Sequence, residues 1–325
     1  MAAIIQKQRT IVESIPFHTI RADSELDFSV YYKGKDQKFK KIVQSGNRFG
    51  KELKRKLASV NIEQLFVSTK EKEHYFSYLD KTLNEMSKDM DVPLKEKALV
   101  LYDGAVKVLE GIFENPEAKI NAHRVKSLVK NTVDIVLSHE HSTKALIDVS
   151  SYEYYTQTHS VDVAVYATAF AHRLGFSRSD LERIGYSAMM HDIGKCRIDK
   201  EIIYKPAALD IREFDQIKRH TSLGYFILKG LMENDRDVLN GVRYHHERHD
   251  GSGYPERLKG KNIPLFAQIV GLSDVFSALS TKRIFKDAHS SLEALHIMQQ
   301  DMGATFDKTL LDAFVTFMIP NVPKE

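Results

Sequence analysis

The chain has little cysteine and no long apolar run. Among 325 residues there is one cysteine, Cys196, so no disulfide can form within the chain, which favours a reducing compartment. No segment approaches the roughly 20 apolar residues that a membrane-spanning helix needs. Residues 1–18 also lack the apolar core of a signal peptide. We therefore expect a soluble, cytoplasmic protein with no membrane span.

An excess of charge of one sign is also missing. The 47 lysines and arginines nearly balance the 44 aspartates and glutamates, which leaves a formal net charge of +3. A basic run between Lys51 and Lys56 includes Glu52, and we interpret it as the solvated face of a helix. The composition thus gives no reason to expect a nucleic-acid polymer as partner. The hydrophobic content of 42% is enough to form a core.

Hydrophobic patterning separates a small mixed region from a long helical one. Short alternating or aromatic patterns predict strands at 27–32, 39–43 and 62–67. Apolar residues at helical spacing predict helices at 50–59 and 71–86. From Pro93 onward the pattern is helical. Amphipathic helices at 94–113 and 122–137 either join two domains or mediate dimerisation. We expect a mainly α protein, in which an all-α bundle follows a small α/β N-terminal domain.

Histidine and aspartate recur through the helical region at intervals of about one helix plus a turn. The most informative stretch is the pair His245-His246, which precedes a glycine-rich loop ending in Gly253-Tyr254-Pro255. Adjacent histidines leave a helix in different directions, yet beside such a loop both can reach one polar pocket. The candidate ligands are His159, His191, Asp192, His220, His245, His246 and Asp274.

Three of these candidates follow the apolar stripe of their own predicted helix. His220, His245 and Asp274 each lie one or two helical turns from aliphatic residues, so they point toward the core. An ionised aspartate in a core is costly unless it is paired or bound to metal. A single histidine on an apolar face is usually a hydrogen-bonded core residue, but a set of seven favours metal binding.

The types of ligand restrict the chemistry of the predicted site. Because the set holds no thiolate, a structural zinc site of the cysteine kind is unexpected. Imidazole with carboxylate suits iron, manganese or zinc in a dinuclear arrangement. Two such ions can hold the attacking and leaving oxygens of an in-line displacement at phosphorus. The residues therefore predict displacement at phosphorus as the chemistry of the site.

At these residues the chain resembles the HD-GYP domain family, the branch of the HD superfamily that contains bacterial cyclic di-GMP phosphodiesterases. The resemblance covers about residues 138–320. Its motifs are HDIGK at 191–195, KRHTSLG at 218–224, HHERHDGSGYP at 245–255 and DVFSAL at 274–279. Paired histidines with a GYP loop distinguish this branch from other HD hydrolases.

The resemblance assigns roles to residues of this chain. The seven candidates would hold two divalent transition-metal ions, iron or manganese, with zinc, nickel or cobalt as alternatives. Asp192 would bridge the ions, and a hydroxide bridging them would attack a phosphate that Lys195 contacts. Arg283 and Lys286 would bind substrate phosphates, and Tyr254 would shape the loop beside the substrate.

The chain departs from the family pattern at a few positions. Tyr155 stands where some members have a glutamate that helps hold a third metal, so we expect two ions. Ser277 replaces the second aspartate of the family's DxxDAL pattern, and Ile284 replaces the proline of its Arg-Pro-Tyr. None of these changes removes a predicted dinuclear ligand.

The resemblance implies hydrolysis of cyclic di-GMP to linear pGpG, with further hydrolysis to GMP left open. Two alternatives remain: a catalytically weak cyclic-dinucleotide receptor and a phosphodiesterase for cyclic GMP-AMP. The expected parts are a regulatory or sensor domain at 1–90, a helical connector at 91–137 and the catalytic domain at 138–325. A diguanylate cyclase at the GYP loop and a second copy of the chain are the expected protein partners.

Overall fold

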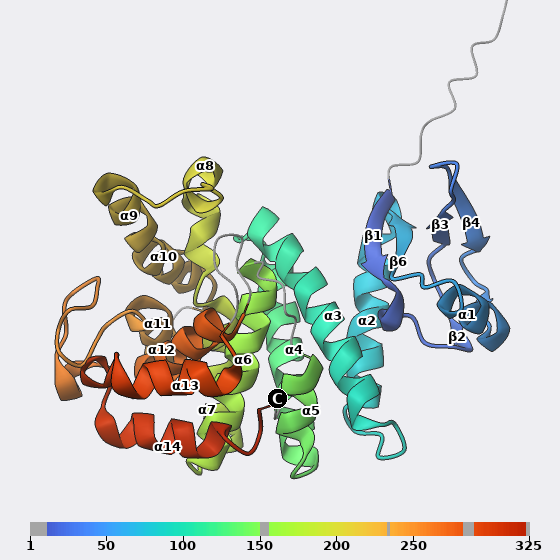
Figure 1. Ribbon diagram of the computed structural model, residues 1–325. Helices are drawn as coiled ribbons and strands as arrows, with labels where there is room; N and C mark the ends of the chain where they lie inside the picture. The colour runs from blue at the N-terminus through green and yellow to red at the C-terminus, as the bar shows by residue number, and fades with distance from the viewer. Residues whose placement is uncertain (1–11, 150–155, 233–234, 282–288, 323–325) are drawn as a thin grey trace, which may run out of the picture. The chain divides into compact units, whose positions relative to one another are not determined.

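The chain forms two compact units, Met1–Met86 and Ser87–Glu325. The computed structural model in Figure 1 describes residues 12–149, 156–232, 235–281 and 289–322. The expected functional parts, 1–90, 91–137 and 138–325, stay a prediction, because contacts within the chain separate two units rather than three roles.

The first unit combines a small sheet with two helices. Four strands in the order β1-β6-β3-β4 pair antiparallel, and two two-residue strands form a second ladder. The elements are β1 (Val12–Pro16), β2 (Ser24–Glu25), β3 (Val30–Lys33), β4 (Phe39–Val43), β5 (Arg48–Phe49), α1 (Lys51–Ala58), β6 (Gln64–Ser68) and α2 (Lys72–Met86). On α2, Tyr75 is fully buried and meets the ring of Phe28 edge-on at 5.8 Å. This contact places aromatic residues at the centre of the small core.

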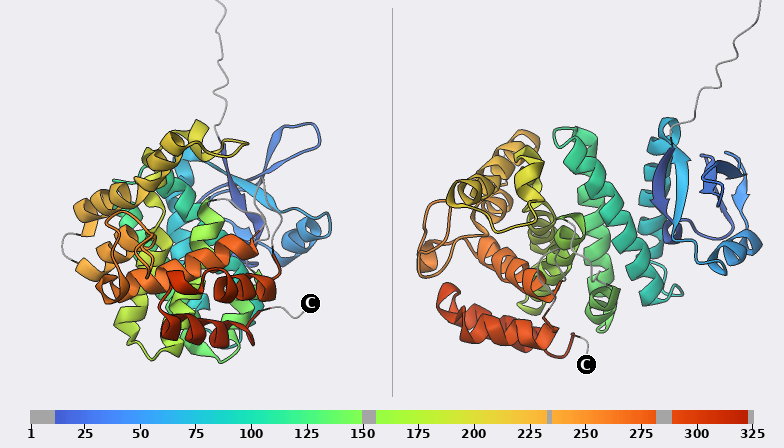
Figure 2. Two further views of the ribbon diagram at one scale, coloured as in Figure 1. Left: turned by 60° about the vertical axis from the view of Figure 1, so that its left-hand side comes forward. Right: turned by 45° about the horizontal axis from the view of Figure 1, so that its top comes forward.

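The second unit is helical throughout its described residues. Its first helices are α3 (Leu94–Glu114), α4 (Lys119–Ser138), α5 (Ser142–Val149), α6 (Thr156–Arg173) and α7 (Arg178–Met190). The later elements are η3 (Ile193–Arg197), α8 (Lys200–Ile203), α9 (Ile211–Lys218), α10 (His220–Met232), α11 (Arg236–Tyr244), η4 (Gly260–Asn262), α12 (Leu265–Ser280), α13 (Ser291–Gln300), η5 (Gly303–Thr305) and α14 (Lys308–Met318). Figures 1 and 2 show α14 on the side of the bundle away from α8 and α9.

Helix α6 lies at the centre of this bundle, in contact with α7 and α12. On it, Phe170 is fully buried and its ring lies 5.0 Å from that of Phe314 on α14, edge to face. Phe276 on α12 approaches the same Phe314 ring at 5.8 Å. These three rings connect α14 to α6 and α12, the helices that carry His159 and Asp274.

The helix ends follow the local sequence. Asp210 and Ser290 each form a complete capping box with the glutamate three positions on, as the spacing predicts. Ser177 accepts from the backbone N–H of Asp180, where the box has aspartate in place of glutamate. Gly175 ends α6 with a φ of +83°, a conformation that favours glycine.

The predicted fold class, mainly α with a small α/β N-terminal region, is confirmed. The strand predicted at 39–43 matches β4, and the helices predicted at 71–86 and 94–113 match α2 and α3 to within one residue. The strand predicted at 27–32 begins later, at Val30, because residues 27–29 turn into the sheet with Phe28 and Ser29 buried. No helix in the described ranges is both long and apolar enough to cross a bilayer.

We expect Phe314→Ala to lower the free energy of unfolding of the helical unit by about 3–5 kcal/mol, because it removes a fully buried ring between two neighbours. Phe226→Ala is the matched control, since that side chain is 64% exposed and should change stability by less than about 0.5 kcal/mol. Chemical denaturation followed by far-UV circular dichroism measures both variants. Equal, small losses would show that the ring cluster does not hold α14 to the bundle.

Candidate metal centre

The structure brings all seven candidate ligands together at one end of the helical core. His191 ends α7 and Asp192 follows it, His220 begins α10, and His245 and His246 follow α11. Only His159 on α6 and Asp274 on α12 lie inside long helices. Five of the seven thus come from helix ends, where adjacent residues leave the helix in different directions.

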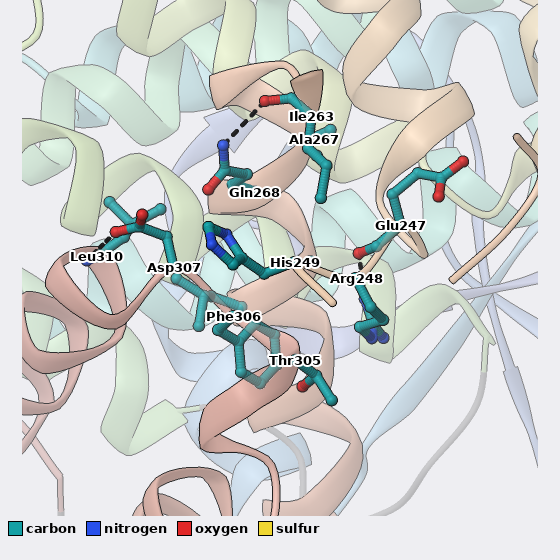
Figure 3. Close-up of a pocket in the computed structure, with 12 residues that line it drawn as sticks. Glu247, Arg248, His249, Ile263, Ala267, Gln268, Thr305, Phe306, Asp307 and Leu310 are labelled. Atoms are coloured by element: carbon teal, nitrogen blue, oxygen red, sulfur yellow. Dashed lines mark hydrogen bonds between the residues drawn. The ribbon is translucent and has the colours of Figure 1, made fainter. Parts of the chain in front are cut away.

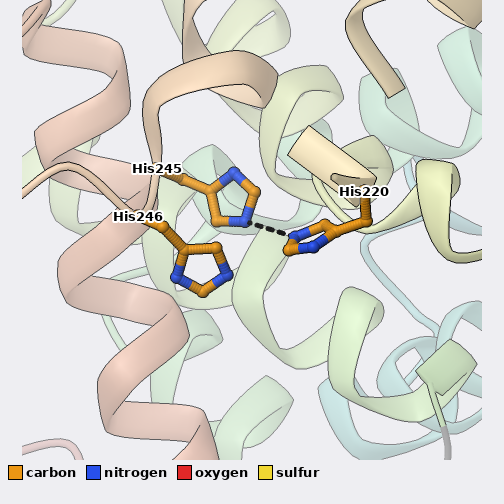
Figure 4. Close-up of side chains that lie close together, drawn as sticks. All are labelled: His220, His245 and His246. Atoms are coloured by element: carbon orange, nitrogen blue, oxygen red, sulfur yellow. Dashed lines mark hydrogen bonds between the residues drawn. The ribbon is translucent and has the colours of Figure 1, made fainter. Parts of the chain in front are cut away.

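His220, His245 and His246 form the first group (Figure 4), whose ring nitrogens lie within 4.8 Å of one another. The Nδ1 atoms of His220 and His245 lie 2.6 and 2.8 Å from the backbone oxygens of Ile217 and Val242. A carbonyl oxygen only accepts, so each Nδ1 carries the proton and each neutral ring turns a bare Nε2 inward. These two Nε2 atoms face each other at 3.4 Å.

Two lone pairs that face each other at this distance repel unless a cation lies near both. Burial lowers the pKa of His220 to about 4. Burial and the neighbouring histidines hold the pKa values of His245 and His246 well below the usual 6.5. The three rings are therefore neutral at pH 7 and keep their lone pairs for a metal ion.

His159, His191 and Asp192 form the second group, again with ligand atoms within 4.8 Å of one another. His191 donates from Nδ1 to the backbone oxygen of Ala188 at 2.7 Å, so its Nε2 points into the site. That Nε2 is buried and, within the described part of the chain, has no hydrogen-bond partner. A buried polar atom left in this way indicates a missing ligand.

Asp192 stands between the two groups. Its Oδ1 lies 3.3 Å from His220 Nε2, and its Oδ2 lies 3.4 Å from His191 Nε2. Each carboxylate oxygen therefore faces a different histidine group, which is the arrangement that a bridging ligand requires. Burial alone would raise the pKa of Asp192, but Lys195, His191 and His220 together hold it well below 3.8. The carboxylate is ionised, as metal binding demands.

Asp274 closes the site from α12. Its Oδ1 lies 3.0 Å from His159 Nε2 and 3.9 Å from His191 Nε2, while its Oδ2 lies 3.8 Å from His246 Nδ1. Burial would lower the pKa of His191, but Asp192 and Asp274 raise it above 6.5. The two carboxylates thus attract positive charge to the centre. Five imidazoles and two carboxylates fit two transition-metal ions and offer no sulfur ligand.

The motif after paired His245-His246 is held by backbone contacts. Both carboxylate oxygens of Glu247 accept backbone N–H groups, from Glu256 at 2.7 Å and from Leu258 at 2.9 Å. A side chain at Gly253 would clash, since its Cβ would lie 2.4 Å from the His246 oxygen. The loop therefore folds back on its own beginning. Tyr254 consequently stacks on the His246 ring at 4.7 Å.

Figure 3 shows what lies behind this motif, around a cavity of about 10 Å³. The Arg248 guanidinium lies 5.6 Å from the Phe306 ring and donates to the oxygens of His245 and Glu247. The backbone N–H of His249 donates to the Thr305 oxygen at 2.8 Å. The tail of the chain thus supports the segment that carries the paired histidines.

Sequence reasoning missed three supporting residues that act through these contacts. Glu247 and Arg248 stand inside the HHERHDGSGYP motif, and only the structure shows which backbone groups they bind. Ser277 was noted only as a departure from a pattern. Its buried Oγ lies 2.9 Å from His159 Nδ1, so one face of α12 contacts both ring nitrogens of His159. Arg283, Lys286 and Tyr155 lie outside the described residues.

We expect Gly194→Ala to reduce metal content and to lower the melting temperature. A Cβ at residue 194 would lie 1.9 Å from the His220 backbone oxygen and 2.6 Å from the Gly224 nitrogen, so α10 would have to move. Overpacking of this kind typically costs about 1–3 kcal/mol. Gly230→Ala on the same helix is the control, because nothing lies within 4 Å of its added Cβ. Elemental analysis and thermal denaturation give the two measurements, and parent-like values for Gly194→Ala would contradict the close approach.

We expect Ser277→Ala to weaken metal binding about tenfold, because loss of an outer hydrogen bond to a metal-binding histidine typically costs 10–100-fold in affinity. The matched control is Ser280→Ala, one turn on, whose hydroxyl donates only to the Phe276 oxygen of its own helix. Competition with a chelator measures the affinity of each variant. Equal affinities in the two variants would mean that Ser277 does not orient His159.

Comparisons with known proteins agree with this geometry. A family model described as "HD domain" matches residues 126–310. The curated relatives include "Cyclic di-GMP phosphodiesterase response regulator RpfG" of Xanthomonas campestris, 40% identical over 45% of this chain and 39% of that protein. Another is "3'3'-cGAMP-specific phosphodiesterase 2" of Vibrio cholerae, 34% identical over 48% of this chain and 30% of that protein. The chain thus spans well under half the length of these relatives.

Among solved structures, the fold matches that of an HDG"Y"P protein from Bdellovibrio bacteriovorus. The TM-score is 0.69 at 20% identity, over 95% of this chain and 99% of the other. At 20% identity, this similarity shows the fold alone. The family model, by contrast, covers more than half of the present chain. The family model shows that the chain belongs to the HD domain family, and the paired histidines with the GYP loop identify its HD-GYP branch.

Proposed function

We propose that the chain is a metal-dependent phosphodiesterase that hydrolyses cyclic di-GMP. The observation that carries this proposal is Asp192, whose two oxygens face two separate groups of histidines. The names of the relatives support the substrate class, since several are called cyclic di-GMP phosphodiesterases. The product would be linear pGpG, with GMP as the product of a second cleavage.

In this proposal, one set of residues would bind the metal ions and another would bind the substrate. His159, His191 and Asp274 would hold one ion, the group of His220, His245 and His246 would hold the other, and Asp192 would bridge them. When bound, two such ions supply an activated water and neutralise charge at the phosphate. Iron or manganese suits these ligands, with zinc, nickel or cobalt as alternatives.

Lys195 would contact the substrate phosphate. Its Nζ lies 2.5 Å from Asp192 Oδ2, and its side chain is 18% exposed at the edge of the buried centre. An ammonium there can donate to a non-bridging phosphate oxygen and stabilise the charge that grows on it. Tyr254, above His246, would form the other side of the entrance. Arg283 and Lys286 stay predicted contacts to the second phosphate.

A second substrate, cyclic GMP-AMP, is supported by the relatives from Vibrio cholerae named 3'3'-cGAMP-specific phosphodiesterases. The receptor alternative depends on the changes at Ser277 and Ile284. It has less support, because Ser277 contacts His159 and Ile284 lies outside the described residues. A regulatory role for the N-terminal unit, a cytoplasmic location, a homodimer and a diguanylate-cyclase partner at the GYP loop remain predictions from the sequence.

We expect protein reconstituted without oxygen to bind about two iron or manganese ions per chain and to hydrolyse cyclic di-GMP.

Asp192→Ala should lose both turnover and metal, because it removes the bridging carboxylate. Lys195→Ala keeps every ligand, so it should retain metal while kcat/KM falls by about 10²-fold, the loss typical of one electrostatic contact. Elemental analysis and chromatography of the products from cyclic di-GMP and cyclic GMP-AMP provide the readouts.

Two results would contradict the proposal. One is a folded, metal-free parent after reconstitution with either metal. The other is an Asp192→Ala variant with parent turnover, which would remove this residue from the site. Preferential cleavage of cyclic GMP-AMP would instead select the second substrate.

A further inference from the structure

A cavity of about 530 Å³ lies beside the metal centre, within the helical unit. It is formed by the C-terminal end of α3, by η3 and by α8, and its wall also includes residues next to candidate ligands. The lining residues that matter here are Glu110, Phe113, Glu114, Lys195, Lys200 and Tyr204. Its volume falls in the range of about 300–1,000 Å³ that is typical of small-molecule sites.

The cavity and the metal centre share Lys195. This residue lines the cavity, and its Nζ lies 2.5 Å from Asp192 Oδ2. Gln157, two residues before His159, lines the same space. A group bound in the cavity is therefore one side chain away from the proposed position of the scissile phosphate. The cavity is therefore a candidate place for the rest of the nucleotide whose phosphate is cleaved.

Aromatic and acidic side chains in the wall of the cavity suit a purine base. Phe113 on α3 and Tyr204 after α8 supply aromatic faces, and Tyr204 is 56% exposed, so its ring is accessible for stacking. Stacking on aromatic rings holds bases in many nucleic-acid proteins regardless of the type of base. The aromatic residues therefore bring affinity but no choice among bases.

Selectivity between bases can come from the carboxylates in the wall of the cavity. Glu110 and Glu114 are four residues apart on α3, so they lie on one face of the helix, and both line the cavity. Glu110 accepts from Lys107 Nζ at 2.9 Å. An ionised carboxylate only accepts hydrogen bonds and has about four lone-pair sites, so this contact leaves acceptor sites for a ligand. The Watson–Crick edge of guanine offers two adjacent donors, N1–H and the N2 amino group, whereas adenine has an acceptor at N1 and a single donor group, the amino group at C6. A carboxylate that accepts from both adjacent donors of guanine therefore favours guanine over adenine.

We propose that this cavity is the guanine subsite of the chain, with Tyr204 stacking on the base and Glu110 and Glu114 accepting its N1–H and N2–H groups. This proposal rests on the proposed function, because it assumes that the substrate is the cyclic dinucleotide of the proposed phosphodiesterase. It adds that the chain selects for a guanine nucleotide next to the cleaved phosphate. Cyclic di-GMP and cyclic GMP-AMP both meet this requirement, and cyclic di-AMP does not.

The test is equilibrium binding of two mononucleotides to the metal-loaded full chain by titration calorimetry. We expect GMP to bind at least about tenfold more tightly than AMP, since charge-assisted hydrogen bonds distinguish the two bases. In the double variant E110Q/E114Q this preference should shrink at least about fivefold. E96Q is the matched control, an exposed glutamate near the other end of α3 and outside the cavity.

Variants of Tyr204 test the stacking separately. Tyr204→Ala should weaken GMP and AMP alike, by about tenfold, while Tyr204→Phe keeps the ring and should bind both as the parent does. Equal affinities of the parent for GMP and AMP would overturn the subsite, as would a double variant with the parent's preference. Equal GMP binding by Tyr204→Ala and the parent would overturn the stacking role.

Hydrolysis of bis(4-nitrophenyl) phosphate, a phosphodiester without a base, separates this result from the proposed function. If the metal-loaded parent cleaves this diester but binds GMP and AMP equally, the phosphodiesterase proposal holds and the guanine subsite is contradicted. If the parent prefers GMP but cleaves neither this diester nor cyclic di-GMP, the guanine subsite holds and the phosphodiesterase proposal is contradicted.

Discussion

The repulsion between inward-facing imidazole lone pairs governs the centre of this protein. His220 and His245 each direct Nδ1 to a carbonyl three residues back, at 2.6 and 2.8 Å, so neither neutral ring can turn its proton inward without losing that bond. The helix ends that supply these carbonyls meet only around the centre. Because a bound cation removes the repulsion in the folded state alone, metal binding should be coupled to the stability of the helical unit.

Close backbone packing makes this convergence possible. Gly194 lets the segment after Asp192 approach the first turn of α10, and Gly271 lets α12 approach the backbone oxygen of His245. In each case a methyl group would occupy space that the neighbouring backbone already fills. The same two contacts connect the candidate ligands of different helices, so the geometry of the centre depends on backbone as much as on side chains.

The sequence predicted the helices and the seven candidate ligands because both leave a local signal: apolar periodicity for the helices, and adjacent His and Asp for the ligands. It could not predict partners that are distant in sequence. Ser277 and His159 are 118 residues apart, and their contact exists only because α6 and α12 pack together. The strands β2 and β5 were missed because two residues are too few to show alternation. The cavity was missed because α3 reads as an ordinary amphipathic helix.

The position of α3 gives the cavity a further property. This helix is the first of the helical unit, beginning at Leu94 shortly after the N-terminal unit ends at Met86, and its last turn forms a wall of the cavity. Of the seven candidate ligands, none lies on α3. A shift of that turn would therefore change base affinity while the metal ligands stay in place. By thermodynamic reciprocity, a nucleotide that favours one position of α3 must also change the affinity for any effector that moves this helix.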